Sequence, residues 1–133
     1  MSSKRVLLID DQGAQVEKLK GYFSLFRHAR EYEIVTASSG PEIAAALRQG
    51  PPDLLLLDPQ LTSVSGISLL QQMRKLDASL PVIVVTGKQP GRAADEVLKA
   101  GVFAYVPTPC GYEQLEHLVG LVFSPLFKGA AAI

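Results

Sequence analysis

Asp53-Leu54-Leu55-Leu56-Leu57-Asp58-Pro59 is the stretch from which the fold of this chain can be read. Four consecutive leucines are typical of a strand that is buried on both faces, and such strands occur in parallel sheets covered by helices on both sides. Asp58 ends the run, so we expect it at the carboxyl end of the strand. Open α/β sheets bind their ligands at that edge.

A second apolar run repeats this arrangement near the amino terminus. Val6-Leu7-Leu8-Ile9 is followed directly by Asp10 and Asp11. If the two strands are neighbours, three carboxylates meet at one edge of the sheet. Like charges at that separation repel each other unless a cation neutralises them. The pattern therefore predicts a site for a hard metal ion such as Mg²⁺, which prefers oxygen ligands.

The rest of the chain alternates between patterns typical of strands and of helices. Strands are predicted at residues 6–9, 32–37, 54–57, 82–85 and 102–106, and helices at about 12–26, 41–49, 65–80, 93–100 and 111–123. Gly50 and Pro125 mark helix ends, and Pro41 is suited to a first helical turn. Five strand–helix units without an internal repeat predict a single doubly wound α/β domain, and residues 124–133 are interpreted as a tail or linker stub.

Composition limits the function classes. A length of 133 residues fits one domain, and thirteen Lys and Arg balance thirteen Asp and Glu. This balance favours neither nucleic acid nor an anionic membrane as a partner. Cys110 is the only cysteine, so no intramolecular disulfide can form. With no apolar stretch of the roughly 20 residues that a membrane helix needs, we expect a cytoplasmic domain that does not enter a membrane.

Together these residues resemble the receiver domain of two-component response regulators. The resemblance runs from Lys4 to about Phe123 and rests on the residues at four strand ends, namely Asp10-Asp11, Asp58, Thr86-Gly87 and Tyr105. It implies a flavodoxin-like, doubly wound, five-stranded parallel sheet in the order 2-1-3-4-5, with helices on both faces. It also implies that residues 1–123 form the receiver domain.

The resemblance assigns a role to each acid. Asp58 would accept a phosphoryl group from a phosphohistidine on a sensor histidine kinase or phosphotransfer protein. Asp11, Asp58 and the backbone carbonyl of Gln60 would bind Mg²⁺ directly, and Asp10 would act through a bound water. Such chemistry is physically reasonable, because a carboxylate can act as the nucleophile and transfer requires charge neutralisation. The domain would catalyse at most its own phosphorylation and dephosphorylation.

The resemblance also implies a switch. Thr86 would donate its hydroxyl to a phosphoryl oxygen, and Tyr105 would rotate inward behind it. The surface formed by the fourth helix, the fifth strand and the fifth helix would change for an output domain or protein that the sequence does not identify. A homodimer through the same surface is compatible with the sequence but is not required by it.

Two positions depart from the family pattern. At the end of the fifth strand, Thr108 stands where the family has a lysine that pairs with the phosphoryl group. A neutral hydroxyl cannot replace that charge, which puts phosphate retention and switching in doubt. Lys88, two residues beyond Thr86, is a candidate substitute. The second departure is Pro59, which removes an N–H group beside the nucleophile.

Other interpretations follow from the same residues. Asp10, Asp11 and Asp58 could simply cap the turns that follow their strands. Thr108 and Pro59 favour a degenerate receiver that binds a partner regardless of phosphate. A flavin or nucleotide binder would need a Gly/Ser/Thr-rich loop, but residues 10–13 read Asp-Asp-Gln-Gly and repel phosphate without a metal. A phosphatase of the Asp-x-Asp type would need an acid where Gln60 stands.

Overall fold

The four-leucine run forms the central strand β3 (Leu54–Leu57) in the computed structural model of the chain. Each of its leucines is at most 1% exposed. Leu55 and Leu57 pack in one hydrophobic cluster, whereas Leu54 and Leu56 pack in a second one. This alternation places two of the four side chains on each face of the sheet. The prediction of a strand buried on both faces is confirmed.

The structure describes residues 4–10, 12–58, 66–77, 79–86, 101–107 and 111–124. The other strands in this part of the chain are β1 (Lys4–Ile9), β2 (Tyr32–Ala37), β4 (Val82–Thr86) and β5 (Ala104–Pro107). The helices are α1 (Gly13–Leu25), the short 3₁₀-helix η1 (Ala29–Glu31), α2 (Gly40–Gln49), α3 (Gly66–Leu76) and α5 (Tyr112–Val122). The helix predicted at 93–100 and residues 125–133 of the predicted tail lie outside the described residues.

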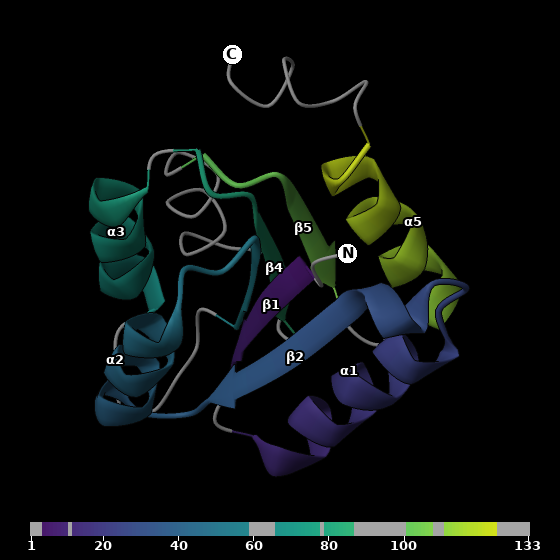
Figure 1. Cartoon of the computed structure of the whole chain (residues 1–133), viewed down its shortest axis with the longest axis horizontal. Coiled ribbons are helices and arrows are strands. Elements are labelled where there is room, and N and C mark those ends of the chain that lie inside the picture. Colours follow the sequence, from purple (N-terminus) through teal and green to yellow (C-terminus); the bar gives the residue numbers. More distant parts are fainter. Residues whose placement is uncertain are drawn as a thin grey trace.

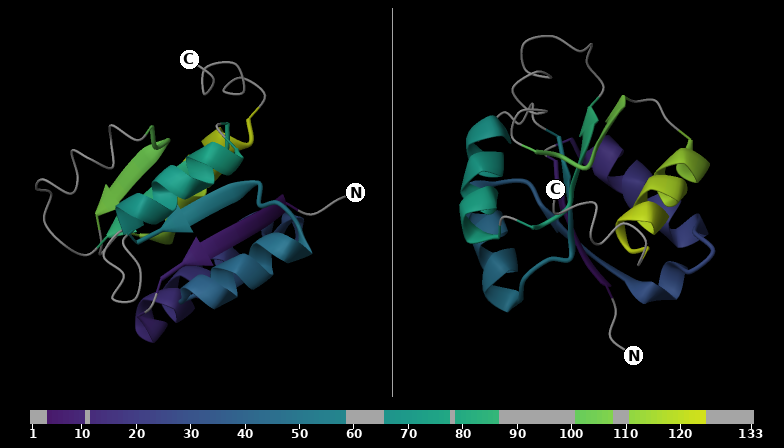
Figure 2. Two further views of the ribbon diagram at one scale, coloured as in Figure 1. Left: turned by 90° about the vertical axis from the view of Figure 1, so that its left-hand side faces the viewer. Right: turned by 90° about the horizontal axis from the view of Figure 1, so that it is seen from above.

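All five strands are parallel and lie in the order β2-β1-β3-β4-β5. The helices α2 and α3 cover one face of the sheet, and α1 and α5 cover the other (Figure 1; Figure 2). The first cluster joins the sheet to α2 and α3 through Ile43, Leu70 and Met73. The second joins it to α1 and α5 through Leu19 and Leu115. The predicted doubly wound architecture and strand order are therefore confirmed.

The bounds of three strands differ from the prediction. β1 begins at Lys4 rather than at residue 6. β4 continues to Thr86, one residue further than predicted. β5 begins at Ala104 rather than 102, because Gly101 turns the chain with a φ of 83° before it enters the sheet. It then includes Pro107, which is tolerated because β5 is an edge strand and need not donate from every residue.

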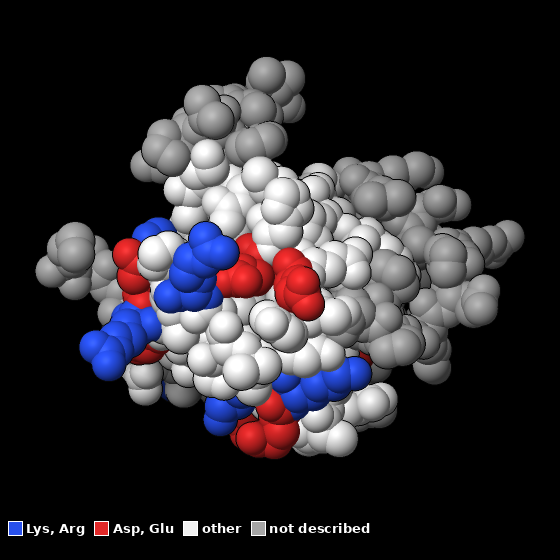
Figure 3. All heavy atoms as spheres, turned by 90° about the vertical axis from the view of Figure 1, so that its right-hand side faces the viewer, with Lys and Arg blue, Asp and Glu red and all other residues white. Residues whose placement is uncertain are grey.

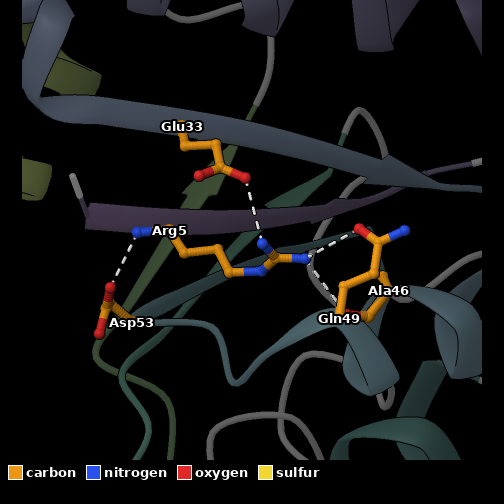
Figure 4. A network of polar contacts seen from close by, with 5 residues as sticks. All are labelled: Arg5, Glu33, Ala46, Gln49 and Asp53. Carbon is orange, nitrogen blue, oxygen red and sulfur yellow. Dashed lines mark hydrogen bonds and ion pairs between the residues drawn. The ribbon is translucent and has the colours of Figure 1, made fainter. Parts of the chain in front are cut away.

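A half-buried arginine links β1, β2 and α2 at the opposite, amino edge of the sheet (Figure 4). The Arg5 guanidinium donates hydrogen bonds to Glu33 on β2 and to the backbone carbonyl of Ala46 and the side chain of Gln49 on α2. The backbone N–H of Arg5 also donates to the Asp53 carboxylate, 2.8 Å away. Because its donors sit at the end of α2, the cation also complements the negative end of that helix dipole.

No helix in the described ranges is long and apolar enough to cross a membrane.

Candidate functional site

Asp10 and Asp58 occupy equivalent positions at the ends of two paired strands. Ile9 and Leu57 are register partners in β1 and β3, and each acid is the next residue along its chain. The backbone N–H of Asp58 donates to the carbonyl oxygen of Ile9 at 3.1 Å, which extends the ladder past the end of β3. The structure thus brings together these two of the three predicted acids at the carboxyl edge of the sheet.

The environment of Asp10 stabilises a buried charge. Its exposed fraction is 2%, and one carboxylate oxygen accepts a hydrogen bond of 2.9 Å from the backbone N–H of Gln12. Its own N–H donates to Ala37 of β2. Because Gly13 begins α1, the carboxylate also lies near the positive end of a helix dipole. Asp10 therefore caps the turn that follows its strand, which is the role that the sequence offered as an alternative to metal binding. It also lies at the candidate site.

Asp58 is half-buried and so is accessible from one side. A carboxylate at such a position can contact a partner protein or a small molecule, while the backbone of Asp58 stays hydrogen-bonded to the neighbouring strand.

Thr86 and Tyr105 come from the next two strands. Leu57 pairs with Val84, so the backbone of Thr86 lies at the same edge, close to the level of Asp58. The side chain of Thr86 lies outside the described residues. Val84 also pairs with Tyr105, whose half-buried ring packs against the cluster beneath α2 and α3. The predicted switch pair is thus carried by adjacent strands.

The remaining predicted site residues lie outside the described part of the chain, namely Asp11, Gln60, Lys88 and Thr108. Their predicted roles as metal ligands, as the replaced lysine and as its substitute stay predictions. Within the described residues, no group of three or more His, Cys, Asp or Glu side chains is placed to hold a metal ion. The pair Asp10 and Asp58 offers only oxygen donors, which is the donor chemistry that suits Mg²⁺.

A cavity of about 390 Å³ lies beside Asp10 and was not predicted. It is bounded by the first turns of α1 and α2, and Glu17 and Glu42 contribute carboxylates to its wall. Glu42 accepts hydrogen bonds from the backbone and hydroxyl of Ser38, and Ser39 accepts one from the N–H of Glu42. This capping arrangement could have been read from the spacing Ser39-x-x-Glu42. The cavity itself leaves no such signal, because it depends on how two helices approach the sheet.

Comparison with known protein families gives a match that covers most of the chain. The model of the response regulator receiver domain matches residues 6–120. The flavodoxin-like sheet described above agrees with this match.

Curated relatives point the same way. The chain is 33% identical over 114 residues to the alginate biosynthesis transcriptional regulatory protein AlgB of Pseudomonas aeruginosa, a match that covers 84% of this chain and 24% of that protein. It is 30% identical over 131 residues to the probable transcriptional regulator ycf27 of Guillardia theta, covering 97% of this chain and 49% of that one. The chain therefore spans half or less of the length of these two relatives.

Solved structures share the fold. A CheY-like response regulator receiver domain protein from Methanospirillum hungatei superposes with a TM-score of 0.77 at 28% identity, covering 89% of this chain and 91% of that chain. A two-component response regulator from Clostridium difficile gives a TM-score of 0.81 at 21% identity, covering 93% of this chain and 98% of that chain, and its likeness supports the fold alone.

Proposed function

Because the chain belongs to the family of response regulator receiver domains, we propose that it accepts a phosphoryl group on Asp58 as a step in two-component signalling. The observation that carries the proposal is the pairing of β1 with β3, which sets Asp10 and Asp58 at one edge. Residues 1–123 would form the receiver domain and 124–133 a tail or linker. The receiver would act in the cytoplasm.

In the proposed reaction, a carboxylate oxygen of Asp58 attacks the phosphorus of a phosphohistidine. The new O–P bond forms as the P–N bond to the imidazole breaks. The departing nitrogen keeps the electron pair of that bond, and the imidazole leaves neutral with one proton on its other ring nitrogen. The product is an acyl phosphate on Asp58. The proposal is supported by the half-buried position of Asp58 and by the backbone hydrogen bond that ties the residue to Ile9.

A divalent cation is required by the charges involved. When bound, Mg²⁺ would neutralise part of the negative charge shared by the phosphoryl oxygens and the carboxylates. We propose that Asp11, Asp58 and the carbonyl of Gln60 hold it directly, with Asp10 acting through water. Asp10 fits this role because it is fixed by Gln12 and the start of α1 and contributes only oxygen atoms. Thr86 would donate its hydroxyl to the transferred group.

The proposed partners follow from this reaction. A sensor histidine kinase or phosphotransfer protein would supply the phosphoryl group. The relatives named above are transcriptional regulators of which this chain covers half or less, so we propose that an output domain or output protein responds to the phosphorylated receiver. Tyr105 on β5 and the neighbouring α5 would carry the change to that partner.

One other function is favoured by a specific feature of the sequence. Thr108 replaces the family's lysine and Pro59 follows the nucleophile, which is the pattern expected of a receiver that binds its partner without phosphate. In that case Asp58 would keep its place in the sheet but would not be modified.

Intact-mass measurement separates the two functions. The protein is incubated with phosphoramidate or acetyl phosphate, with and without Mg²⁺, and the mass increase of one phosphoryl group is located by peptide mapping. We expect a Mg²⁺-dependent increase on Asp58 that Asp58→Ala abolishes and Asp10→Ala reduces.

Asp53→Ala is the matched control, because Asp53 precedes the same strand at its opposite end. This variant should be phosphorylated at the wild-type rate. Absence of any modified wild-type protein at saturating donor and Mg²⁺ would favour the phosphate-independent module.

A further inference from the structure

The connection between α1 and β2 places two arginines and a histidine around a hollow, together with the acid Glu31. Arg27, His28 and Arg30 are exposed and surround a cavity of about 330 Å³, which Phe26 and Ala29 also line. We call the segment from residue 25 to residue 31 the α1–β2 patch. It contains Arg27 and Arg30 with His28 between them, and it ends at Glu31.

Backbone hydrogen bonds hold this patch in one conformation. The N–H of Ala29 donates to Phe26, and the N–H of Glu31 donates to His28 at 2.9 Å. Phe26 is 5% exposed and anchors the turn in the core. The N–H of Arg27 donates to the Glu116 carboxylate of α5. A surface that is ordered before binding loses less conformational entropy when it binds a partner.

The two arginine side chains of the patch form no ion pair within the described part of the chain. Leu25, the last residue of α1, lies at the border of the patch and is 62% exposed. An exposed leucine in the same segment as two arginines that form no ion pair with a described residue offers both an apolar contact and charged contacts.

We propose that the α1–β2 patch is a docking surface for an acidic segment of a partner protein that also carries an apolar side chain. Charge complementarity to Arg27 and Arg30 selects the acidic residues. The apolar residue of the segment would lie against Leu25 and the wall formed by Phe26 and Ala29.

The distribution of charge favours such a segment over nucleic acid or an anionic membrane. Glu31 lines the cavity together with the cations, and Glu116 lies directly beside Arg27. On the face formed by α1 and α5, charged side chains of both signs gather in small groups separated by uncharged surface (Figure 3). A polyanion needs an extended basic stripe, which these acids interrupt. A short segment needs only one or two acids, placed against Arg27 and Arg30 and away from Glu31 and Glu116.

The patch is separate from the proposed phosphorylation site. It lies immediately before β2 begins, whereas Asp58 follows the end of β3, and all strands are parallel. The two sites are therefore at opposite edges of the sheet. The docking surface goes beyond the proposed function. Absence of peptide binding at the α1–β2 patch would leave the phosphorylation of Asp58 untouched, and absence of phosphorylation would leave peptide binding untouched.

The test is a titration of the ¹⁵N-labelled full chain with a short synthetic peptide in which Glu alternates with Leu, followed by NMR. We expect shifts of the amides of residues 25–31 and of α5 near Glu116, with binding that weakens as salt is added. The double variant Arg27→Gln/Arg30→Gln should bind at least about fivefold more weakly, because two charge contacts are lost. Leu25→Ser should weaken binding without changing the salt dependence.

Arg48→Gln is the matched control, since Arg48 is an exposed arginine in the last turn of α2 and lies outside the patch. It should bind the peptide as the wild type does. Circular dichroism establishes that each variant is folded. The proposal is overturned by wild-type affinity in the double variant, by shifts located elsewhere, by an absence of shifts, or by tighter binding of a DNA duplex or of phosphatidylserine vesicles than of the peptide.

Discussion

The backbone N–H of Asp58 donates to the carbonyl oxygen of Ile9, and this bond of 3.1 Å sets the distance between the two strand ends that carry acids. Asp10 follows Ile9 directly, so the acid at the end of β1 cannot move away from Asp58 without breaking the ladder. Each acid sits where the sheet ends and a loop begins. At the proposed site the backbone of Asp58 is thus held by the sheet, whereas its side chain extends beyond the end of the strand.

The first prediction concerns the metal. Mg²⁺ should raise the melting temperature of the wild type, because a ligand that binds only the folded state stabilises it. Asp10→Asn should reduce this increase, since it removes one of the charges that attract the ion while keeping the residue's size. Differential scanning calorimetry at several Mg²⁺ concentrations measures the effect.

The control is Asp53→Asn, in which the acid at the other end of β3 loses its charge but keeps an oxygen that can accept from Arg5. Its response to Mg²⁺ should equal that of the wild type. An equal response in Asp10→Asn as well would show that Asp10 does not belong to the metal site.

The second prediction concerns Arg5. Its side chain is 17% exposed and donates to Glu33, Ala46 and Gln49. Arg5→Met keeps much of the aliphatic stem but removes these donors, so the free energy of unfolding should fall by about 1–3 kcal/mol. Urea denaturation measures it.

Glu33→Gln tests which of these contacts matters. The Glu33 side chain is 56% exposed, so its ion pair with Arg5 is screened by water. We expect a loss below about 1 kcal/mol. A loss as large as that of Arg5→Met would place the energy in the ion pair rather than in the bonds to α2.

The third prediction concerns alkaline pH. Burial raises the pKa of the Tyr32 phenol above its ordinary value of 10.0, and the nearby carboxylates of Glu31 and Glu116 raise the pKa further. Because the folded pKa exceeds the unfolded one, the neutral phenol stabilises the fold. This contribution is complete below the unfolded pKa and is lost as the pH rises through the folded pKa.

Unfolding in urea between about pH 9 and pH 11 should therefore show stability falling with pH, and Tyr32→Phe should flatten the decline. Tyr112→Phe is the control, since Tyr112 is 36% exposed on α5. If both variants keep the wild-type slope, Tyr32 does not cause it.

Strands with buried faces were the part of the fold that could be predicted from the sequence. The apolar runs at 6–9, 54–57 and 82–85 lie in central strands, where both faces need apolar side chains and the pattern is continuous. The edge strand β5 was placed two residues early, because Val102 and Phe103 continue the apolar pattern although Gly101 is still turning the chain.

The candidate site could be predicted only where residues follow strands. Asp10 and Asp58 were found because parallel strands end at a common edge. The contacts of Arg5 with Glu33 and Gln49 join positions far apart in sequence and carry no periodic signal. The same holds for the contact of Arg74 with Gly101, which lies 27 positions away. The half-buried guanidinium also donates to the carbonyl of Leu80, and burial lowers the pKa of Arg74.

The last prediction tests the effect of the missing lysine. If Thr108 is what weakens the response to phosphate, Thr108→Lys should supply an ion pair to the phosphoryl oxygens, and such a charge-assisted bond contributes about 1.5–3 kcal/mol. An energy of that size shifts a balanced two-state equilibrium strongly. NMR of the phosphorylated variant should therefore show larger changes at Tyr105 and α5 than the phosphorylated wild type shows. Thr108→Gln, which adds length without charge, should behave as the wild type.

The variant Lys88→Ala tests whether Lys88 already serves as the substitute for the lysine. If it does, Lys88→Ala should reduce the phosphate-dependent NMR changes of the wild type and have no effect in the Thr108→Lys background. Equal spectra for all phosphorylated forms would mean that the response is limited elsewhere in the domain and not by residue 108.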